Sequence, residues 1–222
     1  MSSQASPTEE NYLKAMFSLV DENGEVSVSD LSRALNVSNP TANSMVKRLS
    51  EKGWVMYKKY KPLKITKEGS YLAASIIRKH RLTEMYLVEK MGFGWEEVHE
   101  IAEQVEHIQS KAFFDRMDEI LGSPSVDPHG SPIPDKNGRV VSNDYIPLSK
   151  LRVGQKAMLK SLNDSSKEFL EFLNLKSIEL GIVIEVVAIE NFDQSMEVRL
   201  AHRNKVLLSK EATKRLMVQP VS

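Results

Sequence analysis

The helix signals between Ser27 and Gly53 restrict the fold of this chain more than any other feature. Ser27 and Ser38 each precede a helix-forming segment, and a serine at that position accepts a hydrogen bond from the first helical turn. Pro40 suits the first turn of the second helix, and Gly53 marks its end. The sequence therefore predicts two short helices joined by a tight turn.

A basic hairpin is predicted directly after this helix pair. Apolar and polar residues alternate in two short runs, 55–57 and 63–65, on either side of a basic turn. Eight basic side chains stand against one acidic side chain between Ser44 and Lys67. A helix pair followed by a basic hairpin is typical of the winged helix-turn-helix, whose second helix enters the major groove of DNA. We therefore expect this segment to bind double-stranded DNA.

The candidate DNA contacts fall into two groups. Small residues at the start of the second helix are expected near base edges and phosphates: Ser38, Asn39, Pro40, Thr41, Asn43 and Ser44. Long basic side chains are expected on phosphates: Lys47, Arg48, Lys58, Lys59 and Lys61. The alternative for the first group is helix capping or simple solvation, and for the second a solvated basic face.

Longer helices and then strands are predicted around this unit. One helix is expected from Pro7 to Val20, a second from Thr66 to Met91 and a third from Trp95 to Leu121. The apolar stripes of the last two suggest a dimer interface. Four prolines between residues 122 and 134 indicate an extended linker. Four predicted strands and a short helix beyond Pro147 indicate a small β-barrel.

Histidine and glutamate residues gather on two consecutive predicted helices. Spacings of three or four residues put them on shared helix faces: His80 and Glu84, then His99, Glu103, Glu106 and His107. Imidazole and carboxylate ligands without sulfur suit Mn(II), Fe(II), Co(II), Ni(II) or Zn(II). The sequence therefore predicts a divalent-metal site. His129 and His202 fit no such pattern and are expected at the surface.

The composition excludes several other classes of protein. The chain has 222 residues and no cysteine, which excludes disulfide scaffolds, thiolate zinc fingers, iron–sulfur clusters and cysteine nucleophiles. No run approaches the roughly 18 apolar residues of a membrane span, and the N-terminus lacks the features of a signal peptide. We therefore expect a soluble, cytoplasmic protein with no membrane partner.

Four segments together resemble the diphtheria-toxin-repressor family. They are Ser-Asn-Pro-Thr-Ala-Asn-Ser at 38–44, Arg-Lys-His-Arg-Leu-Thr-Glu at 78–84, Val-His-Glu-Ile-Ala-Glu-Gln-Val-Glu-His at 98–107 and Ser-Pro-Ile-Pro at 131–134. The resemblance covers nearly the whole chain. It implies a homodimeric bacterial repressor that binds operator DNA when loaded with a divalent metal and controls metal uptake. It also implies no enzymatic activity, no small organic substrate and a C-terminal Src-homology-like barrel.

The resemblance also implies two metal sites. One would use side chains of the helical part and two of the barrel: His80, Glu84, His99, Glu168 and Glu171. The other would use Glu103, Glu106, His107 and Asn11. Iron-responsive members carry a methionine and a cysteine where this chain has Asn11 and Glu103, so Mn(II) is expected to be favoured over Fe(II). Manganese-responsive members carry a carboxylate at the position of Lys14. Glu168 and Glu171 could equally be exposed helix carboxylates.

The expected fold class is mainly α with small β parts. Three domains are expected: a winged helix-turn-helix at 1–72, a helical metal-binding and dimerisation domain at 73–135, and a small ferrous-iron-transport-A-like barrel at 136–222. Two other functions remain open. A metal-independent winged-helix regulator would use the His and Glu residues structurally. A metal-dependent hydrolase would need an open coordination position, and the chain has no His-Glu-x-x-His and no Gly-rich phosphate loop.

Overall fold

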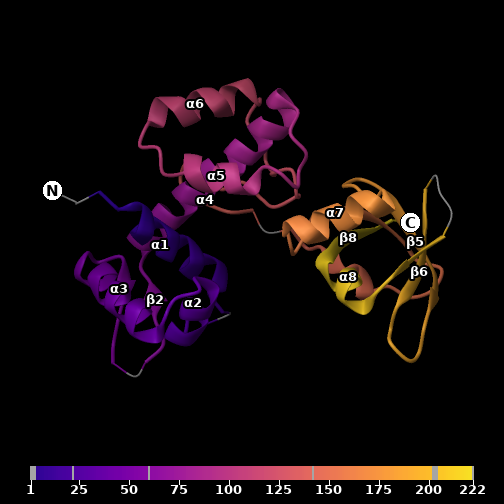
Figure 1. Ribbon diagram of the computed structural model, residues 1–222, viewed down its shortest axis with the longest axis horizontal. Helices are drawn as coiled ribbons and strands as arrows, with labels where there is room; N and C mark the ends of the chain where they lie inside the picture. The colour runs from indigo at the N-terminus through magenta and orange to yellow at the C-terminus, as the bar shows by residue number, and fades with distance from the viewer. Residues whose placement is uncertain (1–3, 22, 60, 142, 202–204, 222) are drawn as a thin grey trace. The chain divides into compact units, whose positions relative to one another are not determined.

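The structure is a computed structural model that describes residues 4–21, 23–59, 61–141, 143–201 and 205–221 (Figure 1). The chain divides into two compact units. The first comprises Met1–Thr83, Ala102–Gly122 and Ile133–Val140, and the second comprises Glu84–Ile101, Ser123–Pro132 and Val141–Ser222. Within the described ranges, no helix has both the length and the hydrophobicity that crossing a bilayer requires.

The N-terminal part of the first unit is a winged helix-turn-helix, as predicted. Its elements are α1 (Pro7–Leu19), α2 (Val28–Ala34), α3 (Asn39–Glu51), β1 (Val55–Met56) and β2 (Lys64–Ile65). Ser27 Oγ accepts a hydrogen bond from the Asp30 amide at 3.0 Å, and Ser38 Oγ accepts one from the Thr41 amide at 3.3 Å. β1 and β2 pair antiparallel. The elements share one buried core, which includes Leu13, Met16, Leu31, Val46, Leu49 and Leu63.

A buried carboxylate fastens α1 to α3. The Glu9 side chain is fully buried, and its Oε1 lies 2.9 Å from Arg48 Nε and 2.8 Å from Lys52 Nζ. Burial alone would raise the pKa of Glu9, but the hydrogen bonds from Lys52 and from the Ser6 amide hold this pKa below its ordinary value. Glu9 is therefore an anion at neutral pH, and ion pairs as well as apolar packing join the two helices.

The predicted helix from Trp95 to Leu121 is wrong. The next helix after α4 (Lys67–Met91) is the short α5 (His99–Val105), and α6 (Lys111–Ile120) begins only after a break. The Ser110 side chain caps α6 by accepting a hydrogen bond from the Phe113 amide at 3.3 Å. The helix ends after α5 because the side chains that follow it pair with residues of α1 and α4, and Ser110 then starts a new helix.

The break also changes which residues are buried. Ile108 and Ala112 are exposed, although both were expected on the inward face of one long helix. Phe114 and Met117 of α6 are buried instead. Restarting the helix at Ser110 shifts its phase, so that a different set of positions faces the core.

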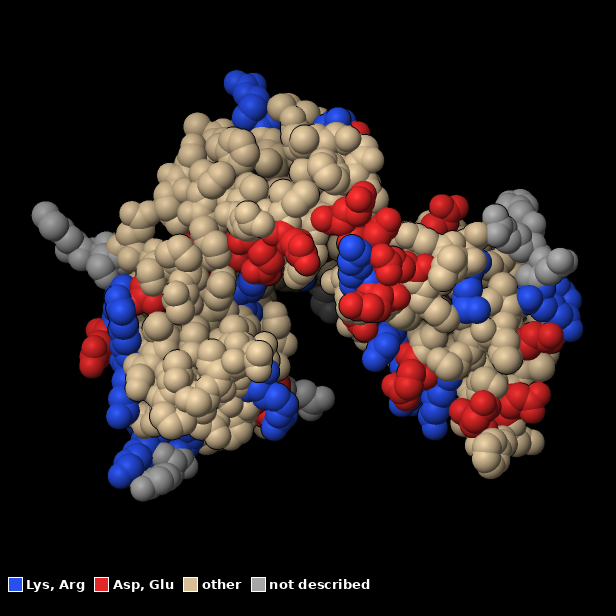
Figure 2. Space-filling view, in the orientation of Figure 1, with Lys and Arg blue, Asp and Glu red and all other residues tan. Residues whose placement is uncertain are grey.

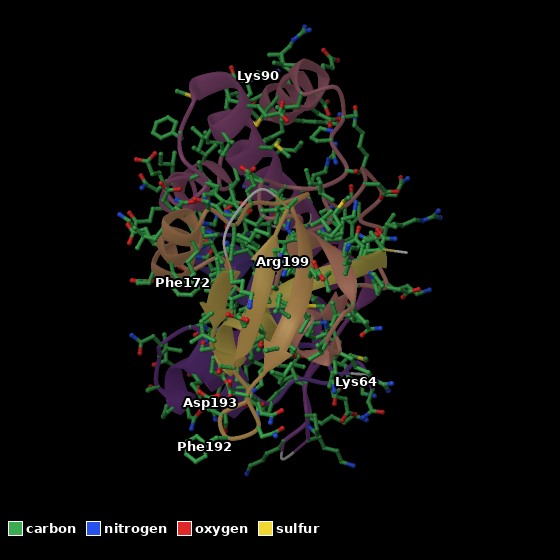
Figure 3. All side chains as sticks on the ribbon, turned by 90° about the vertical axis from the view of Figure 1, so that its right-hand side faces the viewer. Lys64, Lys90, Phe172, Phe192, Asp193 and Arg199 are labelled. Atoms are coloured by element: carbon green, nitrogen blue, oxygen red, sulfur yellow. The ribbon has the colours of Figure 1, made fainter. Side chains whose placement is uncertain are left out.

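The second unit holds the predicted C-terminal β domain. Its elements are β3 (Ile146–Pro147), the 3₁₀ turn η1 (Leu148–Lys150), β4 (Lys156–Leu162), α7 (Lys167–Lys176), β5 (Val183–Ile189), β6 (Met196–Leu200), β7 (Lys205–Leu208), α8 (Lys210–Arg215) and β8 (Leu216–Val221). The strands form one antiparallel sheet in the order β3-β8-β4-β5-β6-β7. Figure 3 shows this sheet, with Arg199 on it and Phe192 and Asp193 in the turn between β5 and β6.

The segment between α6 and β3 carries a tight, buried turn at residues 127–130. The Asp127 side chain accepts hydrogen bonds from the amides of His129 and Ser131, at 2.8 and 2.9 Å. The expectation that His129 lies at the surface is wrong, because this residue is only 2% exposed. Its ring is held inside by a hydrogen bond to the backbone of Trp95. His202 lies outside the described residues.

Gly130 lets this turn approach β4 closely. Its φ is +82°, and a Cβ at this position would lie 2.1 Å from the Lys160 carbonyl oxygen and 2.7 Å from Ser161 Cα. Gly154 has a similar φ of +85°, but a Cβ there would have no heavy atom within 4 Å. The two glycines therefore share the same backbone requirement and differ only in the space around them.

We predict that Gly130→Ala destabilises the second unit far more than Gly154→Ala. The positive φ costs an alanine roughly 1–2 kcal/mol at either position. The clash with the β4 backbone should add about 1–3 kcal/mol at Gly130 alone. Calorimetric unfolding of the full chain measures both variants. Equal destabilisation by the two substitutions would contradict the close approach of the turn to β4.

Candidate metal centres and DNA-binding surface

Three helices and the turn after α5 bring together a polar group in the first unit. We call it the first cluster; its members are Glu10, Asn11, Lys14, His80, Glu103, Glu106 and His107. At its centre is the fully buried Glu106, whose Oε2 lies 2.6 Å from His80 Nδ1. The Lys14 Nζ lies 2.7 Å from Glu106 Oε1 and 2.5 Å from Glu103 Oε1. Four residues that were predicted to bind metal therefore lie in one group, His80, Glu103, Glu106 and His107, and a fifth, Asn11, lies on the face of α1 that carries Lys14.

The charge of Glu106 follows from its partners. Burial alone would raise the pKa of this carboxyl, but the hydrogen bond from His80 and the charge of Lys14 hold it below its ordinary value. Burial lowers the pKa of neighbouring Lys79, against the attraction of Glu10 and Glu106. At neutral pH, Glu106 therefore presents ionised oxygens, which are the form that binds a cation.

Glu10 orients His107, a role that the sequence analysis missed. The His107 Nδ1 lies 2.6 Å from Glu10 Oε2, and Gln109 Nε2 donates to Glu10 Oε1 at 2.8 Å. Because an ionised carboxylate only accepts hydrogen bonds, Nδ1 carries the proton in the neutral ring, and Nε2 is left as the ligand nitrogen. This Nε2 lies 3.8 Å from Glu106 Oε1. One sequence feature could have indicated this role of Glu10. It stands three residues before Leu13, which places it on the buried side of α1.

Asn11 supplies an oxygen that suits a cation. Its Oδ1 is buried and has no hydrogen-bond partner among the described residues. Leaving a buried carbonyl oxygen unsatisfied costs about 1–3 kcal/mol. The first cluster therefore combines an amide oxygen, carboxylate oxygens and imidazole nitrogens, a donor set that fits a divalent transition metal.

A second cluster lies in the second unit and consists of Glu84, His99, Asp127 and His129. The His99 Nδ1 lies 3.3 Å from Glu84 Oε1, and the His129 Nδ1 lies 3.8 Å from Glu84 Oε2. Ligand atoms of Glu84, Asp127 and His129 lie within 4.8 Å of one another, and all three residues are buried. Glu84 and His99, which were predicted as parts of one site, therefore lie together in the second cluster.

The tautomer of His129 is set by the backbone. His129 Nε2 lies 2.9 Å from the Trp95 carbonyl oxygen, which can only accept a hydrogen bond. In the neutral ring, Nδ1 is therefore the ligand nitrogen, and it is the atom nearer to Glu84. The sequence analysis missed Asp127 and His129 because their roles arise from the folded turn. Glu168 and Glu171 are exposed on α7 and remain predictions.

The predicted DNA contacts lie on the winged unit and are mostly exposed. Figure 2 shows lysine and arginine side chains along one side of this unit, over α3 and at the hairpin. Exposed members are Ser38, Asn39, Pro40, Thr41, Ser44, Lys47, Arg48, Lys58, Lys59 and Lys61, and Asn43 is half-buried.

Several of these side chains already have partners within the protein. Ser38 Oγ and Thr41 Oγ1 lie 2.8 Å apart, and Ser44 Oγ donates to the Pro40 carbonyl at 2.9 Å. Asn39 Oδ1 accepts from Ser32 Oγ of α2 at 2.7 Å. Arg48 pairs with Glu9. Of these contacts, the one between Asn39 and Ser32 joins α3 to α2, and the one between Arg48 and Glu9 joins α3 to α1.

Three family models match successive parts of the chain. The model for the N-terminal DNA binding domain of the iron dependent repressor matches residues 4–63, and the model for the metal binding and dimerisation domain of the same protein matches 66–135. The FeoA domain model matches residues 146–220. The three matches follow the same order as the winged unit, the helical part and the C-terminal sheet.

Curated relatives are named as repressors. The iron-dependent repressor IdeR of Mycobacterium tuberculosis is 35% identical over 127 residues, which are 57% of this chain and 55% of the relative. The match to IdeR thus spans little more than half of its length. The diphtheria toxin repressor of Corynebacterium diphtheriae is 27% identical over 209 residues, which are 89% of this chain and 90% of the relative.

Solved structures share the fold over almost the whole chain. A manganese-dependent transcriptional repressor in complex with manganese has a TM-score of 0.87 and 29% identity, with 96% of this chain and 100% of that chain covered. The manganese regulator SloR has a TM-score of 0.76 and 26% identity, with 98% of this chain and 100% of that chain covered. Together with the three domain matches, these similarities establish that the chain belongs to the diphtheria-toxin-repressor family of metal-dependent transcriptional regulators.

Proposed function

We propose that this chain is a repressor that binds operator DNA as a dimer when a divalent metal occupies the first cluster, and that it controls metal-uptake genes. The observation that carries the proposal is the buried, ionised Glu106, whose carboxylate lies 2.6 Å from His80 Nδ1 and 3.8 Å from His107 Nε2. Asn11 and Glu106 lie on separate elements of the first unit, so a shared ligand would join them. The domains proposed are 1–72, 73–135 and 136–222.

The residues of α1 connect this centre with the DNA-binding helix. Asn11, Glu103, Glu106 and His107 would hold the ion, and Glu10 would orient His107. A bound cation would supply positive charge, and each of these donors would bind to it as a ligand. Glu9, on the same helix, holds Arg48 and Lys52 of α3. Fixing α1 against the turn after α5 therefore restricts where α3 presents its exposed face.

The size of the effect of metal on DNA binding follows from thermodynamic linkage between the two binding equilibria. A ligand that binds only the DNA-competent arrangement stabilises it by about 2.7 kcal/mol at a hundredfold excess over its Kd. That free energy corresponds to a shift of about a hundredfold toward DNA binding. Exposed apolar side chains of the helical part, Ile108, Phe113 and Ile120, support a dimer, since two such faces would bury one another.

Mn(II) is the metal we propose. The donors are oxygen and nitrogen only, and the amide of Asn11 and the carboxylate of Glu103 are harder ligands than sulfur. Similar solved structures are named for manganese, which supports this choice, although one of them, ScaR, is described with Cd2+ and with Zn2+. The relatives are named as regulators rather than enzymes, which argues against the hydrolase.

Removing two ligands of the first cluster should abolish metal-dependent DNA binding. We predict that Glu103→Ala with His107→Ala loses the roughly hundredfold gain in affinity that Mn(II) gives over chelator. The DNA is a duplex selected from a random pool by the wild type with Mn(II). Glu190→Ala with Glu211→Ala removes two exposed carboxylates and is the control. Metal-dependent binding by the first variant would contradict the ligand assignment.

The orienting role of Glu10 predicts a change in metal affinity. Glu10→Gln should weaken Mn(II) binding about 10- to 100-fold, because a neutral amide fixes the His107 tautomer less firmly than a carboxylate. Competition with a chromophoric chelator measures the Kd. The control is Glu119→Gln, which changes an exposed glutamate of α6. A Kd within twofold of the wild type would show that Glu10 does not act through His107.

Sulfur ligands should shift the metal preference. We predict that Mn(II) activates the wild type at least as well as Fe(II) in anaerobic DNA-binding titrations. Asn11→Met with Glu103→Cys should tilt the response toward Fe(II), Co(II) or Ni(II), since softer donors favour these ions. Identical metal profiles before and after the exchange would mean that these two residues do not set the preference.

The helix and the hairpin should contribute differently to DNA recognition. Lys61→Ala should weaken binding to selected and random duplexes alike and lower the salt slope by about one unit, because it removes one phosphate contact. Pro40→Ala or Asn43→Ala should change the preferred sequence, at about 1–3 kcal/mol per lost contact. Binding to both duplexes across a salt series separates the two effects. A change in sequence preference from Lys61→Ala alone would reverse the assignment.

A further inference from the structure

The ammonium of Lys14 occupies the space between two carboxylates of the first cluster. Its Nζ lies 2.5 Å from Glu103 Oε1, and 2.7 and 3.0 Å from the two oxygens of Glu106. Both glutamates could otherwise bridge a pair of metal ions, as carboxylates do in two-metal sites, whose ions lie about 3.5–4 Å apart. Lys14 contacts three of the four oxygens of these two carboxylates.

We propose that Lys14 is a built-in second cation of the first cluster, so that this cluster binds one metal ion and not two. The proposal rests on the function proposed above and specifies the number of ions that act there. Lys14 follows Glu10 by four residues and Asn11 by three, so all three side chains lie on one face of α1. Helix α1 therefore carries both the ammonium of Lys14 and the amide ligand of Asn11.

The surroundings of Lys14 hold it in place. Its side chain is 19% exposed, so the ammonium has lost most of its water. Three oxygens of two glutamates accept its hydrogen bonds. A second divalent ion at this place would have to displace a covalently attached charge. One ion can instead bind beside it, on the Asn11, Glu103, Glu106 and His107 donors.

The tethered charge also positions the two glutamates. Lys14 of α1 pairs with Glu103 of α5 and with Glu106, and these ion pairs hold both carboxylates near α1. A single ion then completes a set of ligands that the protein has largely assembled. In this respect Lys14 is a positioning residue as well as a charge.

The test measures metal stoichiometry and the magnetic coupling of bound Mn(II). Equilibrium dialysis with elemental analysis gives the ions bound per full-length chain, and electron paramagnetic resonance separates isolated Mn(II) from an exchange-coupled pair. The wild type should show isolated ions only. Lys14→Glu, which exchanges the ammonium for a bridging ligand, should bind one more Mn(II) per chain and give the coupled signal. Lys14→Arg, which keeps the charge, should match the wild type.

Each outcome of these measurements supports or overturns the proposed role of Lys14. A coupled pair in the wild type, or no further ion in a folded Lys14→Glu chain, overturns the role of Lys14 while leaving the proposed function intact. Mn(II) binding that is unchanged by Glu106→Ala overturns the proposed function, and the role of Lys14 with it. If Lys14→Glu does not fold, as judged by circular dichroism, the signal of the wild type and the stoichiometry of Lys14→Arg still decide.

Discussion

The interior of the first unit depends on one buried carboxylate, that of Glu106. Taking an ionised carboxylate out of water costs several kcal/mol unless hydrogen bonds and opposite charge replace the lost hydration. Lys14 and His80 provide that replacement from two other helices, at 2.7 and 2.6 Å. Since neither partner is local in sequence, Glu106 remains a favourable anion only while α1, α4 and the end of α5 are packed together. The polar cluster therefore specifies the packing of these helices.

Helix α1 carries this constraint to the DNA-binding surface. Successive residues of a helix point about 100° apart, so neighbouring glutamates reach different partners. Glu9 binds Arg48 and Lys52 on the α3 side, while Glu10 binds His107 on the side of the first cluster. One rigid helix thus has ionic contacts with the recognition helix and with the candidate metal ligands. A cation bound at the cluster would therefore act on α3 through α1, and no direct contact between the cluster and α3 is needed.

The features that the sequence predicted are local, and the features that it missed depend on the folded chain. Ser27 and Ser38 act within a single helical turn, so their caps could be recognised from spacing alone. The break after α5 could not be recognised from spacing, because it accompanies the pairing of Glu106 with residues of α1 and α4 that are distant in the sequence. Glu10 looks like an ordinary glutamate of a first turn. β8 was missed because its pairing with β4 joins segments far apart in sequence.

The second cluster is linked to the C-terminal sheet by equally short connections. The Trp95 indole donates to Asn174 Oδ1 of α7 at 2.8 Å, and the Trp95 carbonyl accepts from His129. The His129 carbonyl in turn accepts from the Leu162 amide, at the end of β4. The imidazole that would bind a cation is thus held by Trp95, whose indole contacts α7, and it belongs to a residue whose carbonyl contacts β4. A cation at His129 Nδ1 would therefore sit within two residues' contacts of both α7 and β4, through Trp95 and the His129 carbonyl.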